Sequence, residues 1–313
     1  MKKKFLLLLL LGLFLYLIIF PQHAVPAAAS GLLLWYQIIL PTLLPFAILT
    51  GICLSSNLFY LFARPLHRVL AHVLPVSIEG TFPLAAGFLF GFPMGSKICA
   101  SMLEEGKISY EEASVLFIIS NNMSPVFVSS FILNQSLKLP ALVPVTFLIL
   151  YLPPLLLGRF LLKRRKKNAD FLHKNTTSRF QFNFKIIDAA IINGFETLVR
   201  LGGYIMLFSI AVSVLSLLPD IPELVRILFT GGIEITNGIW AVAESSCPLL
   251  TRYLLCIAFT AFGGCSGIAQ TTAMIQGTGL SIRPYILTKF LLCMESSLLA
   301  CLICRMPAIS VYF

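Results

Sequence analysis

The sequence predicts an all-α polytopic membrane protein, and three observations carry this prediction. Of the 313 residues, 58% are hydrophobic and only 12% are charged, whereas soluble domains are nearer half apolar and a quarter charged. The apolar residues gather in several long runs rather than in one. The net charge of +10 collects in Lys2–Lys4, at Arg64 and Arg68, and in Lys163–Lys167, which is the pattern of cytoplasmic loops under the positive-inside rule. We therefore expect membrane lipid, and no nucleic acid, as a partner.

The first apolar run directly follows the N-terminal lysines. Met1–Phe20 fits either a retained signal-anchor helix or a cleaved signal peptide, since Ala27–Ser30 offers small residues for cleavage. The run is long for a signal peptide, so we favour the retained helix. Residues 1–30 are then an N-terminal helix and loop, with the N-terminus in the cytoplasm and Ser30 outside.

An interruption in a later apolar segment predicts the main structural feature of the first half. Leu32–Leu54 returns inward, and the basic segment Asn57–Val76 is expected on the cytoplasmic side. Phe82–Leu103 is then interrupted by the sequence GFPMGSK, Gly91–Lys97. Two glycines and a proline break a helix, and each arm has about half the length that a span requires. Broken backbone at membrane depth is tolerated only beside protein or a water-filled cavity, so this stretch predicts a re-entrant helical hairpin.

A second break lies in the other half of the chain. Leu254–Ile275 contains FGGCSG, Phe262–Gly267, and predicts a second re-entrant hairpin. A shift of 172 residues superimposes the glycines of the two breaks. The charge pattern places the two hairpins on opposite sides of the membrane, so we expect an inverted repeat. Its parts are residues 31–162 as the first repeat, 163–185 as a basic cytoplasmic linker, and 186–313 as the second repeat.

Two further apolar segments carry polar interruptions. Ala113–Leu133 contains NNMSP, Asn121–Pro125, whose serine and proline are typical of a helix start. Leu224–Ala243 contains GGIEITNG, Gly231–Gly238. We expect both transmembrane helices to stop and restart within the membrane.

The breaks hold the candidate substrate-binding residues. Free N–H groups at a helix start and a nearby ammonium favour an anion, which points to Ser96 and Lys97. A charge at this depth costs at least ~2.5 kcal/mol and usually has a partner or a ligand; the alternative is that Lys97 reaches the cytoplasmic surface. Neutral amides and hydroxyls suit a polar ligand, or they only satisfy the broken backbone. The substrate-binding candidates are Gly95, Ser96, Lys97, Asn121, Asn122, Ser124, Thr236, Asn237, Ser266 and Gln270.

Two acidic residues are candidates for ion coupling. Glu234 could bind a coupling proton or Na⁺, or could neutralise Lys97. Glu295 is the second candidate, and its alternative role is a hydrogen bond between helices. The remaining break residues are expected to shape the hairpin tips: Gly91, Pro93, Gly263, Gly264 and Gly267.

The sequence shows no hydrolytic or redox constellation, so we expect neither an enzyme nor a cofactor nor a metal site. All four histidines lie outside the apolar segments. Cys301 and Cys304 have the CxxC spacing, but in an apolar helix they are neighbours one turn apart. The glycines of Gly91–Lys97 enclose too few residues for a phosphate-binding loop, and Ser precedes Lys instead of following it. ATP-driven transport is therefore not indicated.

Four motifs in order carry a resemblance to a known family. Gly91–Lys97, Asn121–Pro125, Glu234–Gly238 and Phe262–Gln270 resemble the corresponding stretches of sporulation integral membrane proteins of the YlbJ/SpoVV type. The resemblance runs from about Gly31 to Arg305. These proteins carry paired nucleoside-recognition gate domains. The resemblance implies a fold similar to that of concentrative nucleoside transporters, with two re-entrant hairpins and interrupted transmembrane helices.

The resemblance also implies a role in endospore formation. The protein would move dipicolinic acid from the mother cell across the outer forespore membrane. Dipicolinate is a compact dianion, which Lys97 and helix N-termini suit better than a neutral nucleoside. A nucleoside or nucleobase carrier and a non-transporting membrane scaffold for sporulation are the alternatives, and a homo-oligomer is left open.

Overall fold

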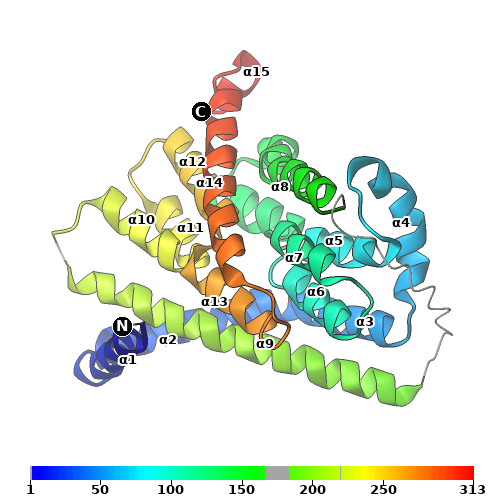
Figure 1. Cartoon of the computed structure of the whole chain (residues 1–313). Coiled ribbons are helices and arrows are strands. Elements are labelled where there is room, and N and C mark those ends of the chain that lie inside the picture. The colour runs from blue at the N-terminus through cyan, green and yellow to red at the C-terminus, as the bar shows by residue number, and fades with distance from the viewer. Residues whose placement is uncertain (1, 167–182, 219) are drawn as a thin grey trace.

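The computed structural model describes residues 2–166, 183–218 and 220–313, and helices without any strand make up this part of the chain (Figure 1). The predicted all-α class is confirmed. Most of the predicted linker 163–185 lies outside the described residues. The helices of the first half begin after α1 (Lys2–Ile19), and those of the second half begin with α9 (Phe184–Ser213).

The N-terminal region is helical throughout, which differs from the prediction. Segments α2 (Pro21–Leu34), η1 (Trp35–Ile39) and α3 (Leu40–Ser55) form one continuous helix of 35 residues. Residues 1–30, which were expected to be a helix followed by a loop, instead contain α1 and the first part of α2. Alanine and leucine favour helix there. The helix continues through Pro26, Pro41 and Pro45, and the π-helical turn of η1 lies just before Pro41.

A helical hairpin follows in the first half. The amphipathic α4 (Phe59–Val73) meets α5 (Ile78–Phe90) at an angle of 88°. After the break at Gly91, α6 (Met94–Glu104) packs back against α5. The predicted break and hairpin are confirmed at this place; that the hairpin is re-entrant stays a prediction.

The predicted interruption at Asn121–Pro125 is also confirmed. Helix α7 (Tyr110–Ile119) ends there, and the chain becomes helical again before η2 (Phe127–Ser136). Ser124 Oγ accepts a hydrogen bond from Phe127 N at 3.2 Å, so the serine caps the second segment as expected. The 3₁₀ turn η3 (Pro140–Leu142) and the long α8 (Val143–Lys166) complete the first half.

The second half contains its own hairpin, but not where the sequence predicted it. Two short helices, joined at Glu234, pack against each other, and the helix after them continues past Gly263 without folding back. Leu249–Met274 is long and apolar enough to be one interrupted span. The elements after α9 are η4 (Val214–Leu217), α10 (Glu223–Ile233), α11 (Ile235–Glu244), α12 (Leu249–Phe262), α13 (Gly264–Met274), α14 (Ile282–Cys304) and α15 (Pro307–Ser310).

The prediction of a hairpin over Leu254–Ile275 is therefore wrong. Gly263 and Gly264 have φ of +84° and +70°, so the glycines do interrupt the helix as expected. A glycine break does not fix the angle between the two arms, however. Packing decides the angle, and the pair that folds back is α10–α11.

The two longest helical segments pack side by side and run antiparallel. Trp35 Nε1 donates to Leu198 O at 2.7 Å, while further along the pair Gly51 lies against Ala190. As residue numbers rise in α2–α3, they therefore fall in α9. This long pair lies along one side of the molecule in Figure 1, below the shorter broken helices.

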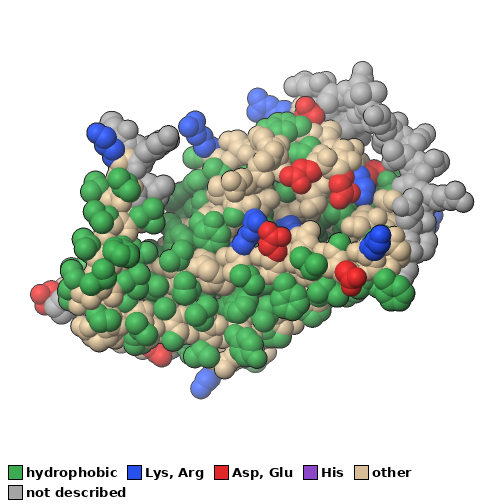
Figure 2. All heavy atoms as spheres, turned by 90° about the horizontal axis from the view of Figure 1, so that it is seen from below, with side chains coloured by type: hydrophobic (Ala, Val, Ile, Leu, Met, Phe, Trp, Pro, Cys, Tyr) green, Lys and Arg blue, Asp and Glu red, His purple; other side chains and the backbone are tan. Residues whose placement is uncertain are grey.

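The lengths and surfaces of the helices fit a membrane. Among the described residues, five helices are long and apolar enough to cross, or six if α4 and α5 form one bent span. Large hydrophobic side chains such as Ile192, Val199 and Met294 are exposed. Figure 2 shows hydrophobic side chains gathered over the left and lower parts of the face seen from below, while charged side chains lie in small groups near its centre, toward its right and along the rim. Such a surface is stable in lipid rather than in water, so the protein is an integral, multi-pass membrane protein.

Candidate substrate site

In the first half, the hairpin tip lies directly against the break of the next helix. Phe92 N donates to Asn122 O at 2.6 Å. Gly91 has φ of +81°, and a Cβ at this position would come within 2.5 Å of Ser124 N. Both the conformation and the close approach require glycine. Two breaks that the sequence shows separately thus form one structural unit.

The second half repeats this arrangement around Glu234. Its backbone is extended, and Oε2 accepts hydrogen bonds from Asn237 N and Nδ2 at 2.9 Å each, and from the Thr236 hydroxyl. Glu234 is therefore the N-cap of α11. Gly264 lies against this tip, since a Cβ there would be 3.3 Å from Ile233 O. Again a hairpin tip meets the break of the following helix.

A cavity of about 580 Å³ takes its wall from both halves, and its volume is in the range of small-molecule sites. Residues from all four breaks line it, together with residues of the continuous helix α2–α3. Its apolar wall includes Phe46, Phe90, Phe92, Phe127 and Phe131. Its polar wall consists of Gln37, Thr42, Ser124, Ser130, Gln135, Glu234, Thr236, Ser266 and Gln270.

The start of α13 forms a polar part of this wall. Gln270 is 3% exposed, and its Nε2 donates to Ser266 Oγ at 2.8 Å, while its Oε1 has no partner among the described residues. No side chain caps α13 at Gly263. The first N–H groups of a helix have no acceptor within the helix, and they carry the positive end of the helix dipole. Gly263 and Gly267 also line the cavity, so donors and an unpartnered acceptor meet at this helix start.

A buried polar cluster lies next to the cavity wall. Asn121 Nδ2 donates to Thr271 Oγ1 at 2.8 Å and to the Tyr285 hydroxyl at 2.9 Å. Lys289 Nζ donates to Asn122 Oδ1 at 3.2 Å and lies 5.6 Å from the centre of the Tyr285 ring. All five side chains are at most 8% exposed. The cluster joins the first-half break to α13 and α14, and its members Asn122 and Thr271 directly adjoin the wall residues Met123 and Gln270 in sequence.

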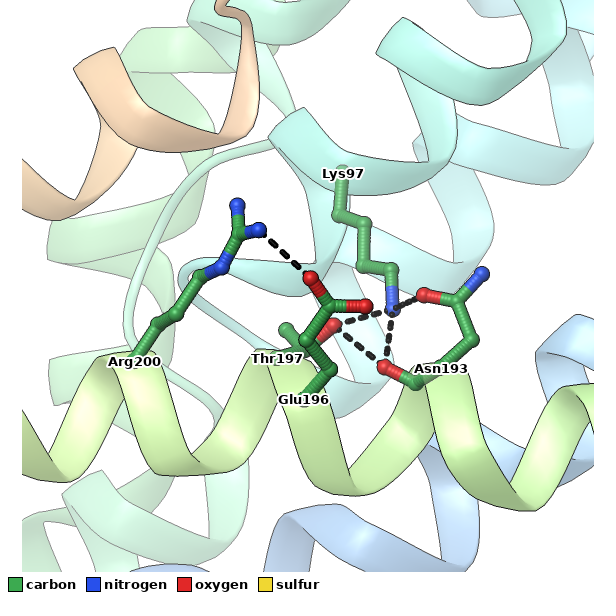
Figure 3. Close-up of polar contacts among 5 residues, drawn as sticks. All are labelled: Lys97, Asn193, Glu196, Thr197 and Arg200. Atoms are coloured by element: carbon green, nitrogen blue, oxygen red, sulfur yellow. Dashed lines mark hydrogen bonds and ion pairs between the residues drawn. The ribbon is translucent and has the colours of Figure 1, made fainter.

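Lys97 lies away from the cavity and contacts α9 instead (Figure 3). Its Nζ donates to Asn193 Oδ1 at 3.0 Å, to Asn193 O at 3.3 Å and to the Thr197 hydroxyl. On the same helix, Arg200 and Glu196 form an ion pair at 2.5 Å. The partner that a lysine at this position requires is therefore a set of oxygens on α9, and Glu234 is not among them.

The remaining sequence-predicted residues fall into two groups. The structure brings seven of them to the cavity wall: Ser124, Glu234, Thr236, Gly263, Ser266, Gly267 and Gln270. The others do not line it. Ser96 is fully buried with an unpartnered hydroxyl, Asn237 bonds to Ser209 of α9 at 3.0 Å, and Glu295 is exposed on α14. Gly91, Pro93, Gly95, Asn121, Asn122 and Gly264 form or support the breaks behind the wall.

Sequence reasoning missed Lys289 and the cavity residues of α2–α3. Lys289 is a lysine in the middle of an apolar span, which by itself marks a candidate functional residue. It also shares a helical face with Tyr285, Ser296 and Ala300, which are all buried. Gln37 and Thr42 gave no comparable signal, because isolated neutral polar residues are common in apolar helices. In the described part of the chain, no three His, Cys, Asp or Glu side chains form a metal-binding group.

Comparison with known proteins identifies a relative for nearly the whole chain. The chain is similar to the sporulation integral membrane protein YlbJ of Bacillus subtilis (strain 168), at 27% identity over 323 aligned residues. The match covers 91% of this chain and 79% of the relative. No protein-family profile matches the chain. No solved structure matches it either. The resemblance seen in the four motifs is confirmed by this similarity.

Proposed function

We propose that this YlbJ-like membrane protein is a secondary transporter of endospore formation, and that its cargo is dipicolinate. The observation that carries the proposal is the cavity of about 580 Å³ on which all four helix breaks converge. Helix breaks within a membrane are costly unless protein or water satisfies the freed backbone groups. Four of them around one cavity are typical of a transporter site. The proposed role includes no chemical conversion of the cargo.

The chemistry of the wall supports a small aromatic anion. The uncapped start of α13 supplies free N–H groups and a positive dipole end for a carboxylate. The phenylalanine rings offer faces for a flat ring, and Phe46 and Phe90 already stack on each other with centroids 4.3 Å apart. A pyridine ring with two carboxylates is much smaller than the cavity.

Glu234 supports transport together with a cation. It is the one charged side chain on the wall among the described residues, and it is 2% exposed. A carboxylate beside a dianion is unfavourable in a site of low dielectric unless a proton or a cation accompanies it. We therefore assign the coupling proton or Na⁺ to Glu234.

The element order supports an inverted repeat, with a pairing that differs from the one predicted. Hairpin α5–α6 corresponds to α10–α11, the broken pair α7–η2 to α12–α13, and α8 to α14. The long segments α2–α3 and α9, which open the two halves, run antiparallel, as the first elements of an inverted repeat would. In this proposal the two hairpins are re-entrant from opposite sides, and their tips close the cavity alternately.

One observation favours a second candidate, a nucleoside or nucleobase carrier. Gln270 Oε1 is an unpartnered acceptor at the wall, and no cationic side chain lines the cavity in the described part of the chain. A neutral base with N–H donors would satisfy this acceptor.

Uptake into proteoliposomes separates the two candidates. Purified protein is reconstituted, and uptake of labelled dipicolinate and of labelled uridine is measured with and without Na⁺ and proton gradients. The proposal predicts gradient-dependent dipicolinate uptake that excess unlabelled uridine does not inhibit. Uptake of uridine without uptake of dipicolinate would establish the nucleoside carrier instead.

A further inference from the structure

Lys289 is a buried cation that has no role in the proposed function as described so far. It projects from the inner face of α14 and is 2% exposed. The only acceptor bonded to its ammonium among the described residues is Asn122 Oδ1, at 3.2 Å. No carboxylate of the described residues lies within ion-pair distance of it, since the ion pairs found there are Lys107–Glu105 and Arg200–Glu196.

A buried ammonium with one neutral acceptor is poorly compensated. Taking a charge out of water costs several kcal/mol unless an opposite charge and further hydrogen bonds repay it. The face of Tyr285, 5.6 Å away, provides only weak attraction. A charged residue within a span usually faces a partner, a ligand or an ion pathway. Its counter-charge is therefore expected to come from a molecule that the protein binds.

The cavity is the place from which this counter-charge can act. Asn122 accepts from Lys289, and the next residues along the chain, Met123 and Ser124, line the cavity. On the other side of the cluster, Thr271 bonds to Asn121 and directly follows the wall residue Gln270. The ammonium thus bonds to the residue that directly precedes the wall residues Met123 and Ser124. In a low-dielectric interior the attraction between two charges is much stronger than at the same distance in water.

We propose that Lys289 is the residue that makes the site selective for anions. The inference rests on the proposed function, because it assumes that the cavity binds the cargo. Glu234 and Lys289 then divide the electrostatic work: Glu234 holds the accompanying cation on the wall, and Lys289 attracts the carboxylates from behind the break. Asn122 holds the ammonium at the break through its Oδ1.

The test compares a dianion with a neutral molecule of the same shape. The probes are dipicolinate and pyridine-2,6-dicarboxamide, and their uptake is measured in proteoliposomes containing wild type, Lys289→Met, Lys289→Arg or Lys107→Met. Lys289→Met removes the charge and keeps most of the side-chain volume, whereas Lys289→Arg keeps the charge. Lys107→Met is the matched control, because that ammonium bonds to Glu105 and to Leu54 O, away from the cavity.

The expected result is a change of selectivity rather than a general loss. Lys289→Met should lower dipicolinate uptake at least about tenfold and should keep or raise uptake of the dicarboxamide. Lys289→Arg should retain most of the dipicolinate uptake of the wild type. Lys107→Met should leave the ratio of dipicolinate uptake to dicarboxamide uptake as in wild type. Retained uptake of the neutral probe also shows that Lys289→Met is folded.

Other outcomes overturn the inference. If Lys289→Met takes up dipicolinate like the wild type, Lys289 has no role in selecting the charge. If the Lys289→Met protein takes up both probes equally poorly while its melting temperature and elution volume stay normal, Lys289 does not select the charge of the cargo either. If Lys289→Met fails to fold, Lys289→Gln takes its place as the uncharged variant. An equal ratio of dipicolinate uptake to dicarboxamide uptake in Lys289→Arg and Lys289→Gln would then refute the inference. If the wild-type protein does not transport dipicolinate at all, the proposed function is refuted, and the selective role of Lys289 is refuted together with it.

Discussion

Glu234 combines two roles in one side chain. One of its oxygens accepts the hydrogen bonds that cap α11, and the residue also lines the cavity. The sequence indicated that this acid lies in a break and could carry a coupling ion. It could not show that the same carboxylate builds the hairpin tip, because the cap depends on the exact backbone angles at residue 234.

Replacing this acid by its amide should separate coupling from transport. Glu234→Gln keeps an oxygen that accepts from Asn237 N and removes the charge, so α11 should keep its cap. We expect dipicolinate exchange between equal concentrations to continue, while uphill uptake driven by a Na⁺ or proton gradient is lost. Glu295→Gln is the comparison, because this acid is exposed on α14. Uphill uptake that survives in Glu234→Gln and disappears in Glu295→Gln would reverse the assignment.

Lys97 has the acceptors that a partly buried lysine requires, but they are not the cargo or Glu234, which the sequence suggested. A lysine at this depth needs acceptors, and it has them in Asn193 and Thr197 on α9. Nothing in the sequence pairs residue 97 with residue 193, since only the packing of the first hairpin on α9 brings them together. The structure indicates a tether between hairpin and long helix rather than a contact with the cargo.

The tether predicts a specific kinetic signature for Lys97→Met. The loss of a charge-assisted hydrogen bond should lower stability by about 1.5–3 kcal/mol, seen as a lower melting temperature in detergent. The KM for dipicolinate should stay within about twofold of wild type, because Lys97 does not line the cavity. In a double mutant with Asn193→Ala the two losses of stability should not add. A KM raised tenfold at normal stability would place Lys97 in the binding site after all.

At the scale of elements, the sequence predicted where helices break better than which helices fold back. All four breaks occur where glycine, proline, asparagine or glutamate interrupts an apolar run. The Gly263–Gly264 break was expected to be a hairpin tip, and it instead interrupts one helical segment that is long and apolar enough to be a single span. The fold-back at Glu234 instead depends on the close approach of Gly231 and Gly238, one on each arm.

The contact between Gly231 and Gly238 can be tested by a substitution that adds a single methyl group. A Cβ at Gly238 would lie 2.2 Å from the Cα of Gly231, and backbone cannot move aside as a flexible side chain can. Gly238→Ala should therefore destabilise the protein by roughly 1–3 kcal/mol. Gly232→Ala is the matched control, since a Cβ there has nothing within 4 Å. Equal melting temperatures for the two variants would show that α10 and α11 do not pack in this way.

At the scale of the whole molecule, the two halves meet at one cavity. Asn121 of the first half bonds to Thr271 and Tyr285 of the second, and a Cβ at Gly267 would lie within 4 Å of Phe92. Composition and charge predicted the membrane class, because these depend on the chain as a whole. The pairing between the halves could not be predicted, because motif spacing in so biased a composition permits more than one alignment of the repeats.

The orientation of the second half follows from the long helix that begins it. Helix α9 has 30 residues, and at about 1.5 Å per residue it exceeds the thickness of the hydrocarbon core. Single cysteines at Lys166 and Asp220, in a background without the native cysteines, should therefore react with a membrane-impermeant maleimide from opposite sides. Labelling of both positions from one side would contradict the inverted repeat.

We propose that the cargo passes through the cavity where the four breaks meet. Gly267 lines this cavity, and a Cβ at this position would lie 3.4 Å from the Phe92 ring, so Gly267→Leu would place a side chain in the path. Thr272→Leu adds a similar side chain on the same helix at an exposed position outside the cavity. Dipicolinate uptake into proteoliposomes should fall at least about tenfold for Gly267→Leu and stay near the wild-type rate for Thr272→Leu. Undiminished uptake by a folded Gly267→Leu protein would show that the cargo does not pass through this cavity.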